Sequence, residues 1–485
     1  MEVARALLLL LATLLATQAL SQQENELPPL LPAEVLASSS AHFPGILKSL
    51  AEQRIAVGKT LEAEGSFDTV FSSEGFNRLN GFYDGRVAGA KFDQRFREFG
   101  GSVYGGYSSS GGDFPIYEDQ YYTSTDGTVK VGVLFSLLRD RTIDNQRFGV
   151  MDARLALQEA EMDVLLTRVG VQQRALNAYW RWVAAGRQLA VYDELLQLAI
   201  DRETGLRQQV EDGSRAEIFL TENAQNITRR QSLVLNARRE FRIAGFELSY
   251  YYRDSVGATV TPQPQRLPST RDLEPHNATP VNLESGVAAT LARRPELLIL
   301  DTALERARNR ILLSENEMKP QVDLNFEYAY GLGDQGNGGP SKDSEDAIVG
   351  FTISVPLERS HARGRLAQAQ AKRDALQFER QRLEDQIELE LRNILLDLNV
   401  ASELAVLARQ EVEQAEIMRL AERQRFEQGA SDFFLVNLRE EAAANARIKH
   451  FAALRESRVA RSNFDAATVN LDQLGIDGTT LGTTY

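Results

Sequence analysis

Apolar residues recur every three or four positions along much of this 485-residue chain, and this spacing predicts long amphipathic helices. Two stretches without proline, residues 116–261 and 357–485, hold most of the pattern. Within the second stretch, the 64 residues 365–428 contain neither glycine nor proline. A continuous helix of that length would extend for roughly 95 Å, whereas helices of globular domains usually span about 10–14 residues. Such a helix must pack against other long helices, which predicts an elongated bundle, a coiled coil or a tunnel.

A second pattern, in which apolar and polar positions alternate, predicts β-strands. Residues 322–330 follow it, a glycine-rich loop comes at 331–339, and the apolar run 347–355 completes a β-hairpin. Residues 66–138 form another β region, in which 15 Phe and Tyr residues are interleaved with Gly and Ser. Aromatic residues near strand ends are typical of the girdles of outer-membrane barrels. The alternative is a soluble hairpin with one half-buried face.

The same order of features occurs twice along the chain. Val131–Arg139 and Val349–Glu358 are both strand-like endings that lead into a long helical stretch. Single glycines, Gly213 and Gly429, then end the two long helices, and each precedes a polar turn and a new helix. The serine that closes each strand precedes its glycine by 77 residues in the first half and by 75 in the second. A proline at the first turn of a helix also opens each half, so we infer an internal duplication.

A linker separates the two halves, since five of the 14 prolines fall within residues 261–280. The expected organisation is a signal peptide at 1–21, a first repeat at 42–260 (helix, β region at about 66–138, long helix, turn at Gly213, helix), a Pro-rich linker at 261–290, a second repeat at 291–475 (helix, β-hairpin at about 322–356, long helix, turn at Gly429, helix) and a C-terminal tail at 476–485.

The N-terminus resembles a secretory signal peptide. An apolar run at 6–16 follows Arg5, and the small residues Ala19 and Ser21 precede a polar segment. The run is shorter than the approximately 20 apolar residues that a membrane-spanning helix needs. We therefore expect the chain to be exported, with cleavage near Ala19 or Ser21.

The composition gives no indication of an enzyme active site. The chain has no cysteine, so it has no disulfide, thiolate metal site, thiol nucleophile or lipid-anchored cysteine. Its four histidines are scattered without the spacing of metal ligands. A formal net charge of −14 disfavours a nucleic-acid partner. We expect neither a catalytic site nor a cofactor nor a bound metal.

In these features the chain resembles the TolC-type outer-membrane efflux proteins, from about residue 42 to about 475. The resemblance rests on the duplicated halves and on four segments in matching order. These are the repeat opening, the hairpin entry, the hairpin exit and the helix end before the second turn: Ala292–Leu297, Lys319–Leu324, Val349–Leu357 and Arg425–Gly429.

The resemblance implies a mixed α/β membrane protein made mainly of long α-helices. Its members form homotrimeric ducts, in which two strands from each repeat give a 12-stranded outer-membrane β-barrel shared by three copies, below which long helices form a periplasmic α-barrel. It further implies a passive exit duct in the outer membrane of a Gram-negative bacterium, extending into the periplasm. A periplasmic adaptor (membrane fusion protein) and an inner-membrane pump or ABC exporter would be its partners in a tripartite efflux or type I secretion system.

Docking of the adaptor is implied at the periplasmic tip, where the two turns would lie. The residues concerned are Gly213 and Gly429, with Gln209 and Arg425 four positions before them. The alternative is that both glycines only cap helices. A related expectation concerns assembly: Ile387, Leu391, Leu395 and Leu398 have the spacing of one buried stripe, and helices of this length are expected to bury such stripes only in an obligate trimer.

The chain departs from the family pattern in two respects. The first half carries about 33 more residues than the second before its strand ending, enough for an additional hairpin or an extracellular loop. Family members often carry aperture carboxylates six residues after each turn glycine, but here those positions are Phe219 and Leu435. The candidate aperture acids are instead Glu217, Asp432, Glu222 and Glu440, and a solvated helix turn explains them equally well.

A functional alternative of another class is a periplasmic helical scaffold or adaptor without a channel. An adaptor would usually show one helical hairpin within a β-rich body, and a coiled-coil scaffold would not need aromatic, glycine-rich hairpins. The sequence does not identify the transported substrate.

Overall fold

The computed structural model describes residues 28–269, 290–334 and 345–476. The expected signal peptide at 1–21 lies outside these residues, as do most of the expected linker and nearly all of the C-terminal tail. The chain divides into two compact units, and each unit takes segments from both halves of the sequence. Unit 1 comprises residues 1–48, 165–294 and 386–485, and unit 2 comprises residues 49–164 and 295–385.

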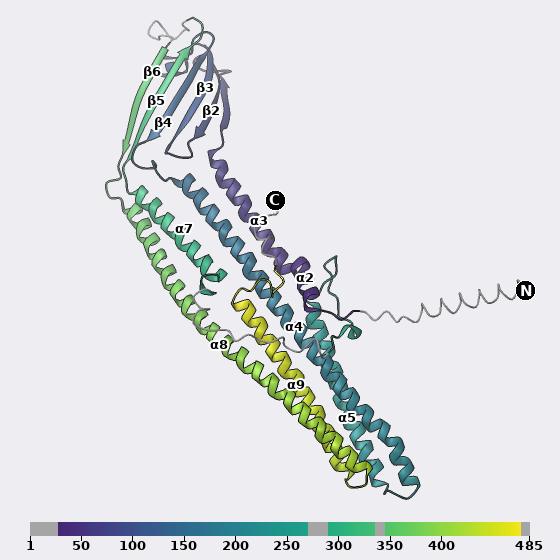
Figure 1. Ribbon diagram of the computed structural model, residues 1–485. Coiled ribbons are helices and arrows are strands. Elements are labelled where there is room, and N and C mark those ends of the chain that lie inside the picture. The colour runs from purple at the N-terminus through teal and green to yellow at the C-terminus, as the bar shows by residue number, and fades with distance from the viewer. Residues whose placement is uncertain (1–27, 270–289, 335–344, 477–485) are drawn as a thin grey trace, which may run out of the picture. The chain divides into compact units, whose positions relative to one another are not determined.

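The described residues are mainly helical, as expected, and contain one β-sheet (Figure 1). In chain order the elements are α2 (Pro32–His42), α3 (Pro44–Glu64), η1 (Gly65–Phe67), β1 (Val70–Asn77), β2 (Gly85–Arg95), β3 (Gly101–Gly112), η2 (Ile116–Tyr121), β4 (Thr128–Ser136), α4 (Asn145–Glu211), α5 (Ile218–Ser249), η3 (Pro264–Arg266), α7 (Pro295–Glu317), β5 (Gln321–Gly331), β6 (Glu345–Ser354), α8 (Ser360–Glu427) and α9 (Phe433–Ala467).

Two helices are far longer than the rest: α4 has 67 residues and α8 has 68. Neither helix contains proline, and α8 holds its only glycine, Gly364, in its first turns. Both helices end just before a glycine with a left-handed backbone conformation. The long uninterrupted helices therefore follow from local sequence, because nothing within them breaks the hydrogen-bond ladder.

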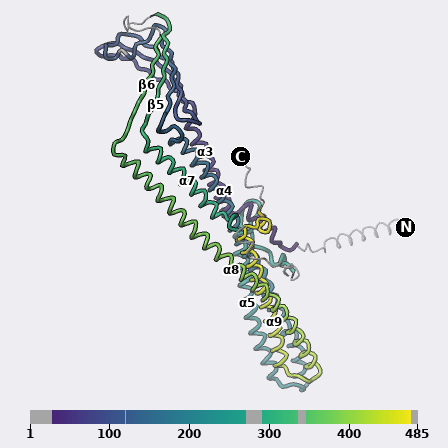
Figure 2. The backbone as a smooth tube through the Cα atoms, turned by 60° about the vertical axis from the view of Figure 1, so that its left-hand side comes forward, coloured from purple at the N-terminus to yellow at the C-terminus, as the bar shows by residue number. Residues whose placement is uncertain are grey.

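Unit 1 is a helical assembly with its core between α4, α5 and α9. Trp182 on α4 is buried and stacks on Phe241 of α5 at a ring-centroid distance of 5.9 Å. Tyr179 lies one turn earlier and donates a hydrogen bond to the Leu30 carbonyl at 2.8 Å, which attaches the segment before α2 to the core. Figure 2 shows α9 beside the second part of α8. Leu395 and Leu398 of α8 pack there with Ala460 and Phe464 of α9.

The expectation for the stripe formed by Ile387, Leu391, Leu395 and Leu398 was wrong in one respect. All four side chains are buried within the single chain, because α9 folds back along α8 and covers the last two of them. This stripe therefore carries no argument for a trimer. A different set of apolar side chains on α8 stays exposed in the single chain: Leu389, Leu396, Leu404 and Leu407.

Unit 2 combines the sheet with α3, α7 and the first parts of α4 and α8. Arg306 of α7 binds Asp152 and Glu159 of α4 at 2.8 and 2.6 Å. The hydrogen bond to Asp152 raises the pKa of Arg306 further, so this arginine stays charged at any pH the fold tolerates. Arg306 belongs to the second half of the chain and its two partners belong to the first. These ion pairs therefore join the two halves.

The sheet is antiparallel and its six strands follow chain order from β1 to β6. Strands β4 and β5, which come from different halves, pair from Thr128↔Gly331 to Ser136↔Asp323. The extra residues of the first half form the additional hairpin β1–β2. The implied contribution of two strands from each half is thus corrected: the first half supplies four strands and the second half two. Each chain has two strands more than a 12-stranded trimeric barrel would need.

Candidate functional site

The two faces of the sheet in unit 2 differ in chemistry. Successive side chains of a strand point to opposite faces. On β5, Phe326, Tyr328 and Tyr330 lie on one face and are 44%, 47% and 42% exposed. The register places apolar residues beside Phe326 and Tyr328 on both neighbouring strands, whereas Tyr330 lies between Val129 and Glu345. The apolar face also includes Phe71, Phe92, Tyr107, Val129, Val131, Val133, Val349, Phe351 and Ile353.

The opposite face of the same sheet is polar and hydrogen-bonded. Glu327 accepts a hydrogen bond of 2.7 Å from the Tyr104 hydroxyl, and its other oxygen lies 3.5 Å from the ammonium of Lys130. Gln321 donates to Asp323 at 2.6 Å. The remaining polar residues of this face include Ser72, Glu74, Lys91, Asp93, Ser102, Asn325, Asp346 and Thr352. A sheet of this kind can separate an apolar medium from water.

The loop between β3 and β4 folds onto the polar face. Its Phe114 is buried beside Tyr83, Tyr121 and Tyr122, with ring-centroid distances between 5.2 and 5.9 Å. A Cβ added at Gly85 would lie 2.5 Å from the Phe114 ring. Position 85 shares the polar face with Lys91 and Asp93, so this contact shows on which side of the sheet the loop lies. The loop thus covers one end of the polar face with aromatic rings.

The two turns of unit 1 are built alike. Gly213 has φ = +71° and Gly429 has φ = +74°. The next amide in each turn reaches back five residues: Ser214 donates to the Gln209 carbonyl at 2.9 Å, and Ala430 donates to the Arg425 carbonyl at 2.8 Å. This is the Schellman arrangement, which satisfies carbonyls that a helix end leaves free. Gln209 and Arg425 therefore have a structural role through their backbones, while both side chains are exposed.

Aromatic and arginine side chains hold the two turns together. The guanidinium of Arg215, after the first turn, lies 4.8 Å from the ring centroid of Phe426, before the second turn, and 5.4 Å from that of Phe219. Phe219 in turn meets Phe433 edge-on at 6.2 Å. Sequence reasoning missed this cluster, although an aromatic residue shortly after each turn glycine was a readable signal. Together these contacts make the two turns one surface, which we call the turn region.

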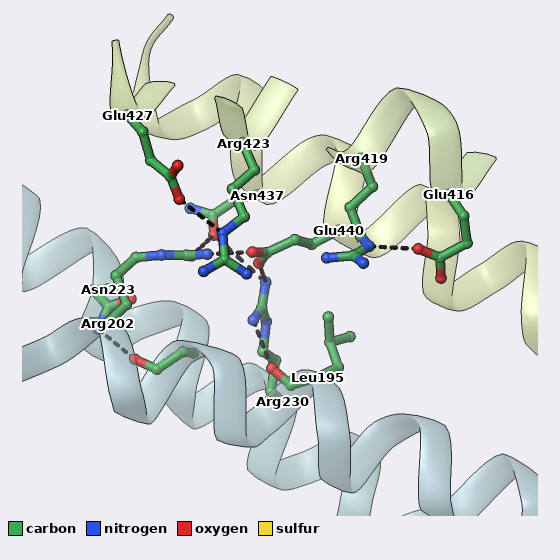
Figure 3. Close-up of polar contacts among 11 residues, drawn as sticks. Leu195, Arg202, Asn223, Arg230, Glu416, Arg419, Arg423, Glu427, Asn437 and Glu440 are labelled. Atoms are coloured by element: carbon green, nitrogen blue, oxygen red, sulfur yellow. Dashed lines mark hydrogen bonds and ion pairs between the residues drawn. The ribbon is translucent and has the colours of Figure 1, made fainter. Parts of the chain in front are cut away.

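A buried ion cluster lies next to the turn region and joins three helices (Figure 3). Glu440 of α9 is bound by Arg230 of α5 at 3.2 Å and by Arg202 of α4. The side chains of Arg230 and Glu440 are only 1% and 4% exposed. Arg230 also donates to the Leu195 carbonyl at 2.7 Å, and Arg202 donates to Asn437 at 2.8 Å.

Burial sets the electrostatics of this cluster. Desolvation lowers the pKa of Arg230, and the carboxylate of Glu440 acts in the opposite direction. The cluster is held because burial has removed water from the charges of Arg230 and Glu440, and Arg202 adds a second countercharge to Glu440. It therefore fixes α9 against α4 and α5.

Comparison with solved structures identifies this architecture. The outer-membrane channel OprN matches with a TM-score of 0.60 and 16% identity, over 90% of this chain and 89% of that one. The Campylobacter jejuni CmeC outer-membrane channel matches with a TM-score of 0.61 and 11% identity, over 93% and 90%. The outer-membrane protein VceC from Vibrio cholerae matches with a TM-score of 0.60 and 15% identity, over 90% and 95%. This chain has the fold of outer-membrane channels. No protein-family model and no curated protein matches the sequence.

The channel fold confirms the structural side of the resemblance drawn from the sequence. The likeness extends over about nine-tenths of each chain, so it includes both halves of the sequence rather than one shared domain. With identities of 11–16%, the likeness concerns the fold and not individual residues.

The four candidate aperture acids of this channel fold have different environments. Glu440 is buried in the ion cluster, where its carboxylate does not meet solvent. Asp432 is exposed and caps α9 by accepting the Leu435 amide at 2.8 Å. Glu217 is exposed, and Glu222 is half-buried. Of the four acids, Asp432, Glu217 and Glu222 are therefore the ones available to a solvent-filled passage.

Other kinds of site have no counterpart in the described part of the chain. Among residues 28–269, 290–334 and 345–476, no group of three or more His, Asp or Glu side chains could hold a metal ion. Within the same ranges, no helix is both long enough and apolar enough to cross a membrane.

The turn glycines allow a first prediction. Gly213→Ala and Gly429→Ala should each lower the free energy of unfolding by roughly 1 kcal/mol, since a β-carbon disfavours positive φ. No atom lies within 4 Å of the added carbon at either site, so the loss comes from the backbone alone. Gly205→Ala is the matched control, because Gly205 is an open position inside α4 and alanine there should stabilise the helix. Urea unfolding followed by helical circular dichroism measures all three, and stabilisation at 213 or 429 would contradict the cap.

Proposed function

We propose that this chain belongs to the TolC-type outer-membrane efflux proteins and forms the outer-membrane exit duct of a tripartite efflux or type I secretion system. The observation that carries the proposal is the two-faced sheet. An exposed face of Phe, Tyr and Val opposite a face of Glu, Asp, Lys and Ser fits a wall between lipid and water. The solved structures of like fold are outer-membrane channels by their titles, which supports the same location here.

The duct must be an oligomer, and we propose a homotrimer. In lipid, unpaired backbone groups at a sheet edge cost several kcal/mol each, so the sheet has to close on itself. Six strands are too few to close around a passage, because eight already fill their interior with side chains. Copies of the chain therefore have to complete the wall. The exposed stripe of Leu389, Leu396, Leu404 and Leu407 on α8 supports packing between copies in the helical part as well.

The duct acts passively in this proposal. It supplies a water-filled exit through the outer membrane of a Gram-negative bacterium and extends into the periplasm, while an inner-membrane pump or ABC exporter supplies the energy. Solvent-accessible carboxylates of Glu217, Glu222 and Asp432 would favour cations at a periplasmic aperture. Glu440 is excluded from that role because Arg230 and Arg202 neutralise it within the helix packing.

Cell fractionation tests the proposal. The protein should appear in the outer membrane as a trimer that resists detergent and changes mobility on heating. A freely soluble periplasmic monomer would contradict the duct and favour the helical scaffold or adaptor.

Docking of the adaptor on the turn region gives a second prediction. Gly429→Trp should leave trimers intact and abolish efflux and adaptor crosslinking, because the side chain of residue 429 would project from an exposed turn with open space around it. Gly364→Trp is a control at an open glycine on the same helix, in unit 2. Normal trimers with normal efflux and normal crosslinking in Gly429→Trp would remove the turn region from the interface and leave the glycine as a helix cap only.

A further inference from the structure

We propose that the membrane wall of this protein has 18 strands rather than 12, with strand β1 of one copy paired to strand β6 of the next. The inference rests on the proposed trimeric duct and concerns the seam between its copies. It assigns the additional hairpin β1–β2 to the wall itself.

The free edges of the sheet identify the seam. Strand β3 is paired on both sides, with β4 and along the whole of β2, from Gly85↔Gly112 to Arg95↔Ser102. Among the strands that the structure describes, those with one unpaired side are β1 and β6. A neighbouring copy can therefore add to β1 or to β6, whereas a 12-stranded wall would first require β2 to leave β3. Three six-stranded sheets joined in this way make a closed sheet of 18 strands.

Strand direction permits this pairing. Every neighbouring pair from β1 to β6 is antiparallel and the number of strands is even, so the two edge strands run in opposite directions. Pairing of β6 with the next copy's β1 is then antiparallel as well. The seam thus has the same hydrogen-bond pattern as every other pair in the sheet.

The faces also continue across the seam. On β1, Phe71 lies on the apolar face beside Phe92, with a ring-centroid distance of 5.0 Å, and Ser72 lies on the polar face. On β6, Phe351 and Ile353 are on the apolar face and Thr352 is on the polar face. A register that sets Ser72 opposite Thr352 keeps both faces uniform around the wall, whereas a shift by one residue would reverse them.

Closing a barrel requires the strands to be offset along their length by a fixed number of residues, the stagger. The stagger that this register requires is one that known barrels have. Straight across the sheet, Val70 lies in one row with Ile348, through Asp93, Tyr104, Gly132 and Glu327. Two registers pair all eight residues of β1 with residues of β6 and keep both faces uniform, with Val70 facing either Thr352 or Ser354. The register that sets Ser72 opposite Thr352 is the second, in which Val70 faces Ser354, six residues further along. Three copies then give a stagger of about 18 residues for 18 strands. A stagger equal to the number of strands corresponds to a tilt of about 36°, as in eight-stranded barrels of shear eight.

The additional hairpin therefore widens the passage. Barrel diameter grows roughly in proportion to strand number, so 18 strands enclose a lumen about 1.5 times as wide as 12 strands do. The aromatic loop around Phe114 folds onto the polar face, which is the lumen side in this arrangement. The loop narrows one end of an otherwise wide passage.

Disulfide crosslinking in the outer membrane tests the seam, because the native chain has no cysteine. Ser72→Cys is combined in turn with Gly350→Cys, Thr352→Cys or Ser354→Cys, all at polar-face positions. Oxidation should yield a covalent trimer from the 72/352 pair, since directly opposed side chains in antiparallel strands are close enough to bridge. Ser73→Cys with Thr352→Cys is the matched control: it points to the opposite face and should give none.

The rival arrangement has its own pair. In a 12-stranded wall, β3 of one copy would pair with β6 of the next. Ser102→Cys on β3 with Thr352→Cys reports that arrangement, since the two residues are three strands apart within one chain and can bridge only between copies. The native mass in detergent is measured for every variant. An intact trimer that crosslinks through Ser102, or through none of the Ser72 pairs, would overturn the 18-stranded wall and leave the duct standing. Absence of any trimer, including that of the native chain, would instead overturn the proposed function.

Discussion

Glu440→Ala is expected to lower the stability of the helical unit by about 3–5 kcal/mol, the usual loss when one partner of a buried ion pair is removed. The substitution leaves the Arg230 guanidinium, which is 1% exposed, without a countercharge. Arg202 loses the same carboxylate. The urea midpoint of the helical circular dichroism signal measures the loss, and hydrogen exchange of α5 and α9 locates it.

The adjacent residue provides the control. Glu441 also pairs with an arginine, Arg229, but that arginine is 56% exposed. Glu441→Ala should therefore cost no more than about 1 kcal/mol. Replacing Arg230 and Glu440 together by leucine should recover much of the stability, since an apolar pair removes the desolvated charges. Equal losses from Glu440→Ala and Glu441→Ala would refute a buried cluster.

Phe326→Arg or Tyr328→Arg should sharply reduce assembly in the outer membrane. Both side chains project from the apolar face of the sheet, and an arginine facing lipid at mid-depth costs about 2–4 kcal/mol. Each copy of a trimer carries the change, so the cost is repeated three times. The yield of heat-modifiable trimer in isolated outer membranes measures the effect.

Asn325→Arg is the matched control, because Asn325 lies between the same strands but on the polar face. The alternation along β5 places Glu327 on the polar face as well. Glu327→Arg is nevertheless unsuitable as a control, since Glu327 accepts a hydrogen bond from the Tyr104 hydroxyl and forms an ion pair with Lys130. An arginine there would lose both contacts and oppose a like charge. Equal loss of trimers from Asn325→Arg and Phe326→Arg would show that the assigned faces are wrong.

Long helices and two-faced strands are the features for which local sequence suffices. Helix α8 lies where proline is absent and Gly364, in its first turns, is its one glycine, and its end at Glu427 is set by the positive φ that Gly429 adopts. The alternation in β5 places Phe326 and Tyr328 on one face whatever the strand pairs with. These features depend on hydrogen bonds and side-chain spacing within a few residues, so one sequence is enough to predict them.

The hairpin β1–β2 is a different case. Its segment, rich in aromatic residues and glycine, was predicted as part of a β region but was not divided into strands. Nearly all residues of strand β1 are exposed, on both faces of the sheet, and the strand alternates only weakly between apolar and polar residues. Its position is decided by the ladder with β2, and β2 in turn by the ladder with β3. Such pairings join separate strands, and a periodicity confined to one strand does not reveal them.

Tertiary structure alone also decided the environment of individual charged side chains and of the apolar stripe on α8. Glu440 and Glu441 are neighbours of the same type in one helix and both pair with an arginine of α5, yet only Glu440 is buried (4% exposed), whereas Glu441 stays 30% exposed. The stripe from Ile387 to Leu398 was readable as buried, but whether α9 or another copy covers it depends on how the chain folds back. Sequence by itself determined which positions are apolar and where helices must end, because these follow from local geometry. Only the packing of distant segments decided what covers those positions and which charges are buried, because desolvation depends on every neighbour at once.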